Sequence, residues 1–495
     1  MILAWIIVVP LLGGALAAVA GRAGTRAPRV VALAALTVDL ALVVACWIAR
    51  PEGAGRFAEL DCAWIPALGV RFHLALDGLS LLLLVLTFLL GALSVLASWS
   101  EIEESVGFFH WNLCWVLAGV AGVFLAVDLF LFYFAWELML VPMYFLIVIW
   151  GHEHRVAAGA KFFLFTQLSG LFMLIAIVGL SFAHHRATGR FSFEYDDLLG
   201  TPLSAAAARW TMLGFFAAFA VKLPMVPLHT WLPDAHTEAP TAGSVVLAGL
   251  LLKTGAYGMI RFVVPLFPAA ARDLAPWAMW LGVADVLYGA LLAFAQTDMK
   301  QLVAYTSVSH LGFVLLGIFS GNALALSGAV LEMICHGLST GALFVITGEL
   351  QERLHTRELT RMGGLWSAAP RLSGAALFFA LASLGLPGLG NFVAEFLVLV
   401  GAWRVSPAAA VVAAVGVLAS TLYALALVQR AFHGANVHRW KIPDLRPREA
   451  IVLAPMVLLL VVLGFYPRPV LVTLGPTSSA PQAQVAAATR PGGPR

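Results

Sequence analysis

Residues 211–228, TMLGFFAAFAVKLPMVPL, and residues 244–260, SVVLAGLLLKTGAYGMI, are long apolar runs that each carry one lysine near the middle. Both runs have about the length that a helix needs to cross a bilayer, roughly 20 residues. A chain that only had to anchor in lipid would carry leucine at Lys222 and Lys253, because a buried ammonium group is costly unless it is paired or hydrated. The two runs therefore predict a helical membrane protein in which these lysines have a task beyond anchoring.

The whole chain has the composition of a polytopic membrane protein. Of its 495 residues, 61% are hydrophobic and 11% are charged, and the mean hydropathy is +0.93. The apolar runs have the length of helices and lack the ~10-residue alternation of an outer-membrane barrel. We therefore predict an all-α bundle, and the N-terminal run 1–20, which lacks the basic start of a secretory signal, is expected to be its first helix.

Apolar runs separated by glycine, proline and charged residues predict fourteen transmembrane helices. They are expected near residues 1–20, 30–49, 76–98, 108–126, 128–150, 157–184, 208–232, 242–265, 273–295, 301–319, 322–349, 370–402, 406–432 and 449–475. Arg and Lys are more frequent in the loops after odd-numbered helices. By the positive-inside rule this predicts that both termini face the outside of the membrane.

Two of the predicted helices, the seventh and the twelfth, are interrupted in their apolar centres. Residues 222–228 contain two prolines, and residues 383–392, SLGLPGLGNF, contain Pro387 and Gly388. Unwound backbone at membrane depth is tolerated only where it is buried in protein or lines a wet cavity, so each break is expected to mark a site. The five-helix spacing of the breaks predicts two inverted five-helix repeats, helices 4–8 and helices 9–13.

This organisation divides the chain into five segments. They are 1–100 with three N-terminal helices, 101–268 with the first repeat, 269–435 with the second repeat, 436–475 with a loop and helix 14, and the tail 476–495. The tail is rich in Pro, Ala and Ser, so we expect it to be disordered.

Six titratable side chains are expected at similar depth in the bundle or beside its breaks. They are Glu137, Lys222, Lys253, His310, His336 and Glu395. Acids, amines and imidazoles at one depth are what a lateral proton path through the membrane requires, so we predict proton transport. Structural alternatives remain open, since a buried acid–lysine pair can fix helix packing, histidines can act as packing donors, and Glu395 can cap a half-helix.

Other site classes find little support in the sequence. The net charge is +3 without a basic stripe, and the four cysteines fall at unrelated spacings, so we expect no nucleic-acid partner and no metal or cofactor bound by this chain. Residues 229–240, HTWLPDAHTEAP, match no zinc spacing and are interpreted as the cap of the eighth helix. Glu101, Glu103 and Glu104 are interpreted as solvated loop charges, and Asp285 has no assigned role.

Several motifs of this chain resemble one known family. They are WELMLVPMYFLI (136–147), KLPMVPLHTWLPDAHTEAPTAGSVVLAGLLLKTGAYGMIRF (222–262), TDMKQLVAYTSVSHLGFV (297–314), MICHGLSTGALF (333–344) and GLPGLGNFVAEF (385–396). From about residue 76 to 435 the chain resembles the antiporter-like proton-pumping membrane subunits of respiratory complex I. Within them it is most similar to the chain M type of bacterial NADH-quinone oxidoreductase, the counterpart of mitochondrial chain 4.

The resemblance implies roles for the six residues. Those matching Glu137, Lys222, Lys253 and Glu395 form the proton channel of that family, and those matching His310 and His336 lie on its polar axis. It also implies a multi-pass chain of the bacterial inner membrane, working as one subunit of a proton-translocating NADH:quinone oxidoreductase.

The resemblance further implies where the redox chemistry lies. FMN, iron–sulfur clusters and quinone are expected in partner subunits and no redox site in this chain, with neighbouring antiporter-like chains and the lipid bilayer as its partners. The alternatives are an Mrp-type cation/proton antiporter subunit and a hydrogenase-linked relative or membrane scaffold in which the charges are vestigial. Glu395 favours chain M, because the related chains usually carry lysine there.

Two positions depart from the pattern of the family. Glu332 stands where glutamine is common, and Cys335 where serine is common. Glu332 and His336 are four residues apart and share a helix face, so the acid is expected to favour a protonated His336. We therefore predict an additional proton site at Glu332.

Overall fold

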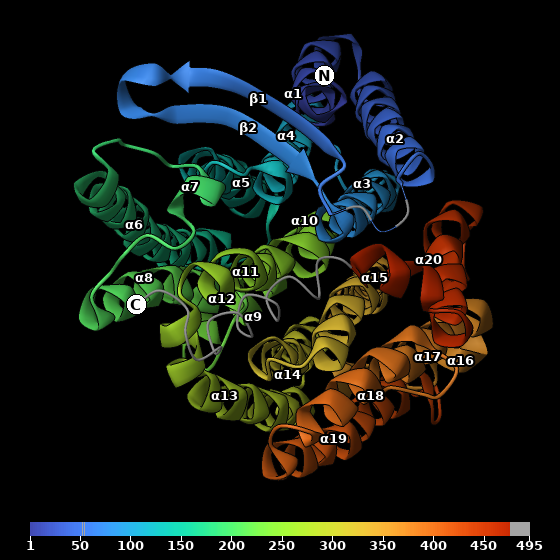
Figure 1. Cartoon of the computed structure of the whole chain (residues 1–495). Coiled ribbons are helices and arrows are strands. Elements are labelled where there is room, and N and C mark those ends of the chain that lie inside the picture. The colour runs from blue at the N-terminus through green and yellow to red at the C-terminus, as the bar shows by residue number, and fades with distance from the viewer. Residues whose placement is uncertain (52, 54, 476–495) are drawn as a thin grey trace.

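The computed structural model describes residues 1–51, 53 and 55–475, which form a bundle of helices with one β-hairpin (Figure 1). The first helices are α1 (Ile2–Ala20), α2 (Arg26–Ile48), α3 (Gly78–Ala97), α4 (Val106–Leu125), α5 (Leu129–Trp150), α6 (Arg155–Thr188), α7 (Tyr195–Leu198) and α8 (Ala205–Lys222). The central helices are α9 (Trp231–Glu238), α10 (Thr241–Val246), α11 (Leu252–Gly258), α12 (Val264–Leu266), α13 (Pro268–Ala295), α14 (Met299–Phe319) and α15 (Ala323–Leu354). The last helices are α16 (Leu365–Ala368), α17 (Pro370–Ser383), α18 (Gly390–Trp403), α19 (Pro407–Phe432) and α20 (Pro447–Phe465). The tail 476–495, for which disorder is predicted, lies outside the described residues.

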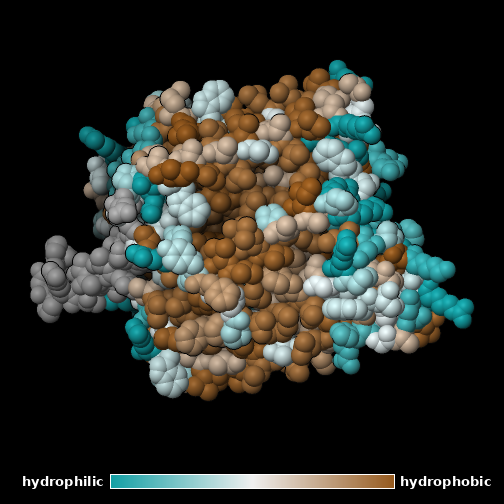
Figure 2. Space-filling view, turned by 90° about the vertical axis from the view of Figure 1, so that its right-hand side faces the viewer, coloured by the Kyte–Doolittle hydropathy of each residue, from teal (hydrophilic) through white to brown (hydrophobic). Residues whose placement is uncertain are grey.

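The described helices have the lengths and composition of membrane spans. Twelve are long and apolar enough to cross a bilayer, and one of these, Thr241–Leu266, joins α10, α11 and α12 through π-helical segments at Leu247–Leu251 and Met259–Val263. Figure 2 shows a broad hydrophobic band with hydrophilic residues along its two edges. The prediction of an all-α polytopic membrane protein is confirmed.

Both predicted helix breaks are present. The seventh predicted helix is divided into α8 and α9, and the twelfth is divided into α17 and α18. A count of fourteen spans requires each divided pair to cross the bilayer as one unit. That count, the two inverted repeats and the segment boundaries stay predictions.

The β-hairpin between α2 and α3 is a feature that the sequence prediction missed. β1 (Ala58–Ile65) and β2 (Val70–Leu76) pair antiparallel, and the turn between them ends at Gly69, whose φ of +71° favours glycine. Figure 1 shows the hairpin lying across one end of the bundle, beside the N-terminal helices. These strands are too short to form apolar runs of helix length, although residues 58–62 alternate apolar and acidic side chains, a pattern that indicates a strand.

Charged side chains fasten the hairpin to the bundle. The Arg71 guanidinium donates two hydrogen bonds of 2.7 Å to Asp61, and the Arg71 backbone N–H donates to Asp128 (3.0 Å), the residue that caps α5. His73 Nδ1 lies 2.8 Å from Glu194 Oε2, just before α7. The hairpin is therefore tied to the start of α5 and to the α6–α8 connection.

The His73–Glu194 contact predicts a pH-dependent attachment of the hairpin. The hydrogen bond to Glu194 raises the pKa of His73. The stability that the His73–Glu194 contact contributes is therefore fully present below the ordinary histidine pKa of about 6.5. It is lost as the pH rises through the raised pKa of His73. Hydrogen exchange of the β2 amides should accelerate over that alkaline range, and His73→Gln should remove this pH dependence. His438→Gln, at an exposed loop position, is the control; an unchanged pH profile in the His73 variant would contradict the prediction.

Glu101 corrects the interpretation of the loop acids. Its carboxylate accepts the backbone N–H of Thr241 at 3.0 and 3.2 Å and so caps the start of α10, whereas Glu103 and Glu104 are exposed as predicted. Burial raises the pKa of Glu101, and the Thr241 hydrogen bond and the nearby Lys300 oppose that rise. The cap of this helix therefore comes from a distant loop and not from the adjacent segment 229–240.

Candidate proton-transfer site

The first helix break positions Lys222 at the end of α8. The chain leaves the helix there because the two prolines that follow supply no backbone N–H. The Val226 N–H donates to Asp285 of α13 (2.7 Å), and the Trp231 indole donates to the carbonyl of Val221 (2.9 Å). These bonds satisfy polar backbone groups that would otherwise be unpaired in an apolar interior.

Lys222 is buried against aromatic rings. Its side chain is 1% exposed, and Nζ lies 5.3 Å from the ring centroid of Trp136 and 5.5 Å from that of Phe162, within the range of a cation–π interaction. Glu137 acts on Lys222 electrostatically. Among the described residues, however, no hydrogen bond engages Nζ or Glu137 Oε1, and no ion pair within 4.0 Å joins the two side chains. Glu137 and Lys222 therefore form no direct pair in this structure.

A small residue on α6 leaves room for the Glu137 carboxylate. A Cβ atom at Gly170 would lie 2.9 Å from Glu137 Oε1, closer than real Cβ contacts. Any larger residue at Gly170 would displace the acid.

Lys253 lies on α11 between the two π-helical segments and is fully buried. Its Nζ donates to the carbonyl of Ala248 and lies 2.6 Å from Nδ1 of His336 on α15. An ammonium group has no acceptor, so a charged Lys253 must donate to Nδ1, and the hydrogen of a neutral His336 is then on Nε2. Lysine and imidazole thus form a direct donor–acceptor pair.

His310 on α14 makes the second direct contact of the site. Its Nδ1 lies 3.0 Å from Oε1 of Glu395, and its Nε2 lies 3.0 Å from the Ser383 hydroxyl and 3.1 Å from the Tyr423 hydroxyl. Both ring nitrogens therefore have polar partners. The ring of His310 meets that of His336 edge to face, with centroids 5.7 Å apart.

The second helix break brings Glu395 to His310. Gly385 and Gly388 have φ values of +79° and +97°, which glycine adopts without strain. A Cβ atom at Gly385 would also lie 3.1 Å from Glu395 Oε2. Glycine at this position therefore allows the turn of the backbone and also leaves space for the Glu395 carboxylate.

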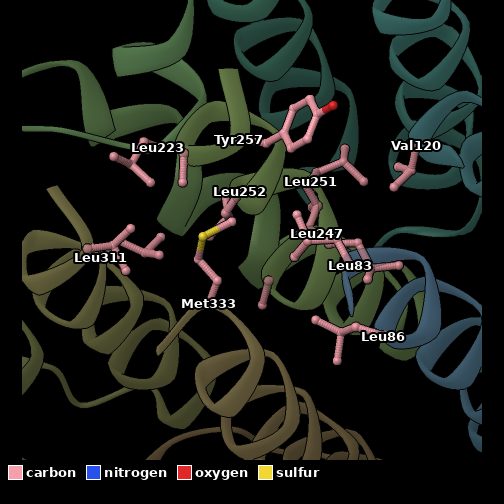
Figure 3. Packing of buried hydrophobic residues seen from close by; sticks show 14 of the residues in the cluster. Leu83, Leu86, Val120, Leu223, Leu247, Leu251, Leu252, Tyr257, Leu311 and Met333 are labelled. Carbon is pink, nitrogen blue, oxygen red and sulfur yellow. The ribbon is translucent and has the colours of Figure 1, made fainter. Parts of the chain in front are cut away.

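The structure brings four of the six predicted residues into one buried series and leaves the other two apart from it. Lys222 and Lys253 share no hydrogen bond in the described chain. In Figure 3, Leu223, Leu252 and Met333 lie in the apolar packing near α11. Proton transfer between the two lysines therefore requires movement of side chains or hydration.

Glu332 does not make the predicted contact with His336. Its Oε1 lies 3.6 Å from Nδ1 of His310 and accepts a hydrogen bond from Asn391 (3.4 Å). The four-residue spacing places Glu332 and His336 on one helix face, but partners on the facing helices determine where the carboxylate points. Lys253 also interacts electrostatically with Glu332.

The polar residues of segment 229–240 go to separate partners. Asp234 forms an ion pair with Lys161 at 2.7 Å, Glu238 accepts a loop N–H, and the His236 ring stacks on Phe344 with a centroid distance of 4.4 Å. Sequence reasoning assigned no role to His236, which is fully buried and interacts electrostatically with Lys253 and Lys300.

Four further polar residues at the site were not predicted. Asp285 accepts a backbone hydrogen bond at the first helix break, Ser383 and Asn391 flank the second break, and Tyr423 contacts His310. Ser383 and Asn391 could have been found from the sequence, because polar residues immediately beside a predicted helix break are candidates for the site. The positions of Asp285 and Tyr423 in distant helices gave no such signal.

Two groups of side chains in the described chain could geometrically hold a metal ion. They are Asp61, His73 and Glu194 at the hairpin, and His310, Glu332 and Glu395 in the bundle. In the first group Arg71 already holds Asp61 through two hydrogen bonds. In the second group the histidine already hydrogen-bonds one carboxylate. In each group a hydrogen bond therefore already engages one of the candidate ligands.

Comparison with known proteins places these features in a family. Residues 126–422 match the family model described as the transmembrane domain of NADH:quinone oxidoreductase and Mrp antiporters. The chain is 52% identical over 488 residues to NADH-quinone oxidoreductase subunit M of Escherichia coli, covering 96% of each chain. It is 54% identical over 490 residues to subunit M of Pseudomonas aeruginosa, covering 95% of each.

Solved structures agree with this assignment. A chain in respiratory complex I from Thermus thermophilus matches with a TM-score of 0.88 and 33% identity, over 98% of this chain and 100% of that chain. A chain in the Mrp complex from Dietzia matches with a TM-score of 0.85 and 24% identity, over 98% of both chains, which shows a shared fold. The chain therefore belongs to the NADH:quinone oxidoreductase/Mrp antiporter membrane family, in its subunit M group.

Proposed function

We propose that this chain is a proton-translocating membrane subunit of an NADH:quinone oxidoreductase, in which Glu137, Lys222, Lys253, His310, His336 and Glu395 carry protons. The observation that supports the relay most directly is the 2.6 Å contact between Lys253 Nζ and His336 Nδ1, buried inside the bundle. An amine and an imidazole in direct contact can exchange a proton that stays inside the protein throughout the transfer.

The relay begins at the first break. Glu137 stabilises the ammonium form of Lys222 when the two approach, and their separation favours release of the proton towards Lys253. The glycine at 170 and the unwound backbone after Lys222 leave room for that movement. In this proposal Lys222 releases its proton when no ion pair joins it to Glu137.

The relay ends at the second break. Lys253 donates to His336, and His310 passes the proton to Glu395 across the 3.0 Å contact. The two imidazoles meet edge to face without a hydrogen bond between them, so transfer between them needs a ring rotation, a bridging water or another side chain. Release from Glu395 towards the outside completes the cycle.

The driving force comes from partner subunits in this proposal. Moving one charge against 100 mV costs about 2.3 kcal/mol. NADH oxidation and quinone reduction with FMN and iron–sulfur clusters would supply it in other chains, and this chain would hold no redox group. Copurification of this chain with a flavin and iron–sulfur protein, and NADH-driven acidification in proteoliposomes, test the assignment.

The orientation proposed for the chain follows its loop charges. Arg353, Arg357 and Arg361 lie at or after the end of α15, and a second basic group lies between α19 and α20, so these loops are assigned to the cytoplasm and both termini to the outside. Labelling of single cysteines at Arg439 and Arg468 tests this, because position 439 should react from the cytoplasmic side and position 468 from the outside.

An Mrp-type antiporter subunit is the second candidate, because the matching family model covers both groups. The Mrp complex match at 24% identity shows the fold alone, whereas the subunit M chains of Escherichia coli and Pseudomonas aeruginosa exceed 50% identity over nearly the whole chain. Sodium-stimulated transport without NADH would favour the antiporter.

Glu137→Gln is expected to slow NADH-driven proton pumping several-fold, because the amide keeps the shape of the side chain and removes the charge that acts on Lys222. Pumping is measured in proteoliposomes, and the titration of Lys222 is followed by NMR of isotope-labelled lysine. Glu153→Gln, which removes an exposed loop acid, is the matched control. Equal pumping in both variants with an unaltered Lys222 titration would show that Glu137 does not act on Lys222.

A further inference from the structure

A second carboxylate lies beside the histidine that contacts Glu395. Glu332 is fully buried on α15, and its Oε1 is 3.6 Å from Nδ1 of His310. Its Oε2 has no hydrogen-bond partner among the described residues. The side chain is therefore aimed into the site with one oxygen free.

The donors around Glu332 are too few for a buried anion. Nδ1 of His310 carries at most one hydrogen, and Glu395 is the nearer acceptor at 3.0 Å. The remaining contact is the Asn391 amide at 3.4 Å, which is long for a hydrogen bond. Two carboxylates next to one imidazole nitrogen in a buried site repel each other when both are charged, and a proton held by one of them removes that repulsion.

Glu332 also lies between the two halves of the relay. It interacts electrostatically with Lys253, and on α15 it is one helical turn before His336. The rings of His336 and His310 do not hydrogen-bond to each other. Glu332 therefore contacts His310 and acts electrostatically on Lys253, and these two residues belong to the two pairs that no hydrogen bond joins.

We propose that Glu332 is an additional proton carrier, which takes a proton from the Lys253–His336 pair and delivers it to Nδ1 of His310 once that nitrogen has released its own proton to Glu395. The inference rests on the proposed proton-pumping function and adds a residue to it.

The transfer conserves protons and charge at each step. The cycle starts with a protonated Glu332, a Glu395 carboxylate and a His310 ring that carries hydrogens on both nitrogens. The Nδ1–H bond of His310 breaks as an O–H bond forms on Glu395, and the O–H bond of Glu332 then breaks as a new N–H bond forms at the vacated Nδ1. An N–H bond of the Lys253 ammonium breaks last, as an O–H bond forms again on Glu332, which leaves a neutral amine and two neutral acids until Glu395 releases its proton.

The charged and titratable groups that face Glu332 come from several helices. They are Lys253 on α11, His310 on α14, Cys335 on α15, Glu395 on α18 and Tyr423 on α19. Any pH profile of the site is a property of this group together.

Glu332→Gln in the intact complex tests the inference by infrared difference spectroscopy during turnover and by pumping in proteoliposomes. We expect the loss of one protonated-carboxyl C=O band and a several-fold slower proton release, and Glu332→Asp should restore a carboxyl band and part of the rate. Glu103→Gln, an exposed loop variant, should leave both readouts unchanged. Wild-type carboxyl bands and rate in the Glu332→Gln complex would overturn the inference.

Two further measurements separate the possible failures. If Glu332→Gln prevents assembly, Glu332→Asp in a complex labelled with 13C-glutamate should replace one isotope-shifted carboxyl band by an unshifted one. The inference is overturned if the isotope-shifted band stays. If Lys253→Ala stops pumping while Glu332→Gln changes nothing, the inference alone fails. If Lys253→Ala pumps normally, the proposed function fails.

Discussion

A complex carrying Lys253→Ala is expected to assemble and to lose proton pumping by about a hundredfold or more, the scale of removing a positioned proton-transfer group. The reason is that Lys253 is the amine in direct contact with His336, and alanine carries no proton. His310, Glu395 and their hydroxyl partners stay in place. NADH-driven acidification of proteoliposomes, compared with the NADH:quinone activity of the same preparation, measures the effect.

Lys161→Ala is the matched control for this experiment. Lys161 is a partly exposed lysine of α6 that forms an ion pair with Asp234 (2.7 Å), and such surface pairs contribute about 0–1 kcal/mol to stability. This variant should pump at the normal rate. Normal proton stoichiometry in the Lys253→Ala complex would remove that lysine from the relay.

Arg353→Gln is expected to lower the free energy of unfolding of this subunit by about 3–5 kcal/mol, the scale of breaking a buried ion pair by removing one partner. The guanidinium side chain is 4% exposed and donates to both oxygens of Glu449 at 2.7 Å and to Glu349 at 3.1 Å. Without the guanidinium, the buried carboxylates of Glu349 on α15 and Glu449 on α20 lie close together with less positive charge to offset their repulsion. Thermal unfolding of the purified complex in detergent, followed by loss of this subunit, measures the change.

Arg439→Gln provides the comparison, since this arginine is exposed in the α19–α20 loop. It should change the thermal midpoint little, as most surface substitutions do. Equal midpoints for the Arg353 and Arg439 variants would show that the network at the end of α15 does not hold α20 to the bundle.

The sequence predicted the parts of the fold that depend on the local composition of the chain. Apolar runs identified the spans, and prolines and glycines in their centres identified both breaks at Lys222 and before Glu395. The fifth helix was predicted to begin at residue 128, and Asp128 caps α5. Each of these features depends on neighbours in the chain, so single-sequence reasoning reaches it.

The features that sequence reasoning missed depend on contacts between distant segments. Helix periodicity placed Glu332 with His336, yet the carboxylate turns to His310 and Asn391 on facing helices. Glu101 was assigned to solvent because its loop is polar, although it caps a helix that begins 140 residues later. Spacing along a chain gives the face of a helix, and only the packing of helices decides which partner meets that face.

The hydrogen bond from the Val226 N–H to Asp285 has a mechanical consequence. It anchors the unwound chain just beyond Lys222 to α13, a helix that carries none of the relay residues. A sideways shift of α13 would pull on this anchor and, through it, on the end of α8, and would thereby change the separation of Lys222 and Glu137.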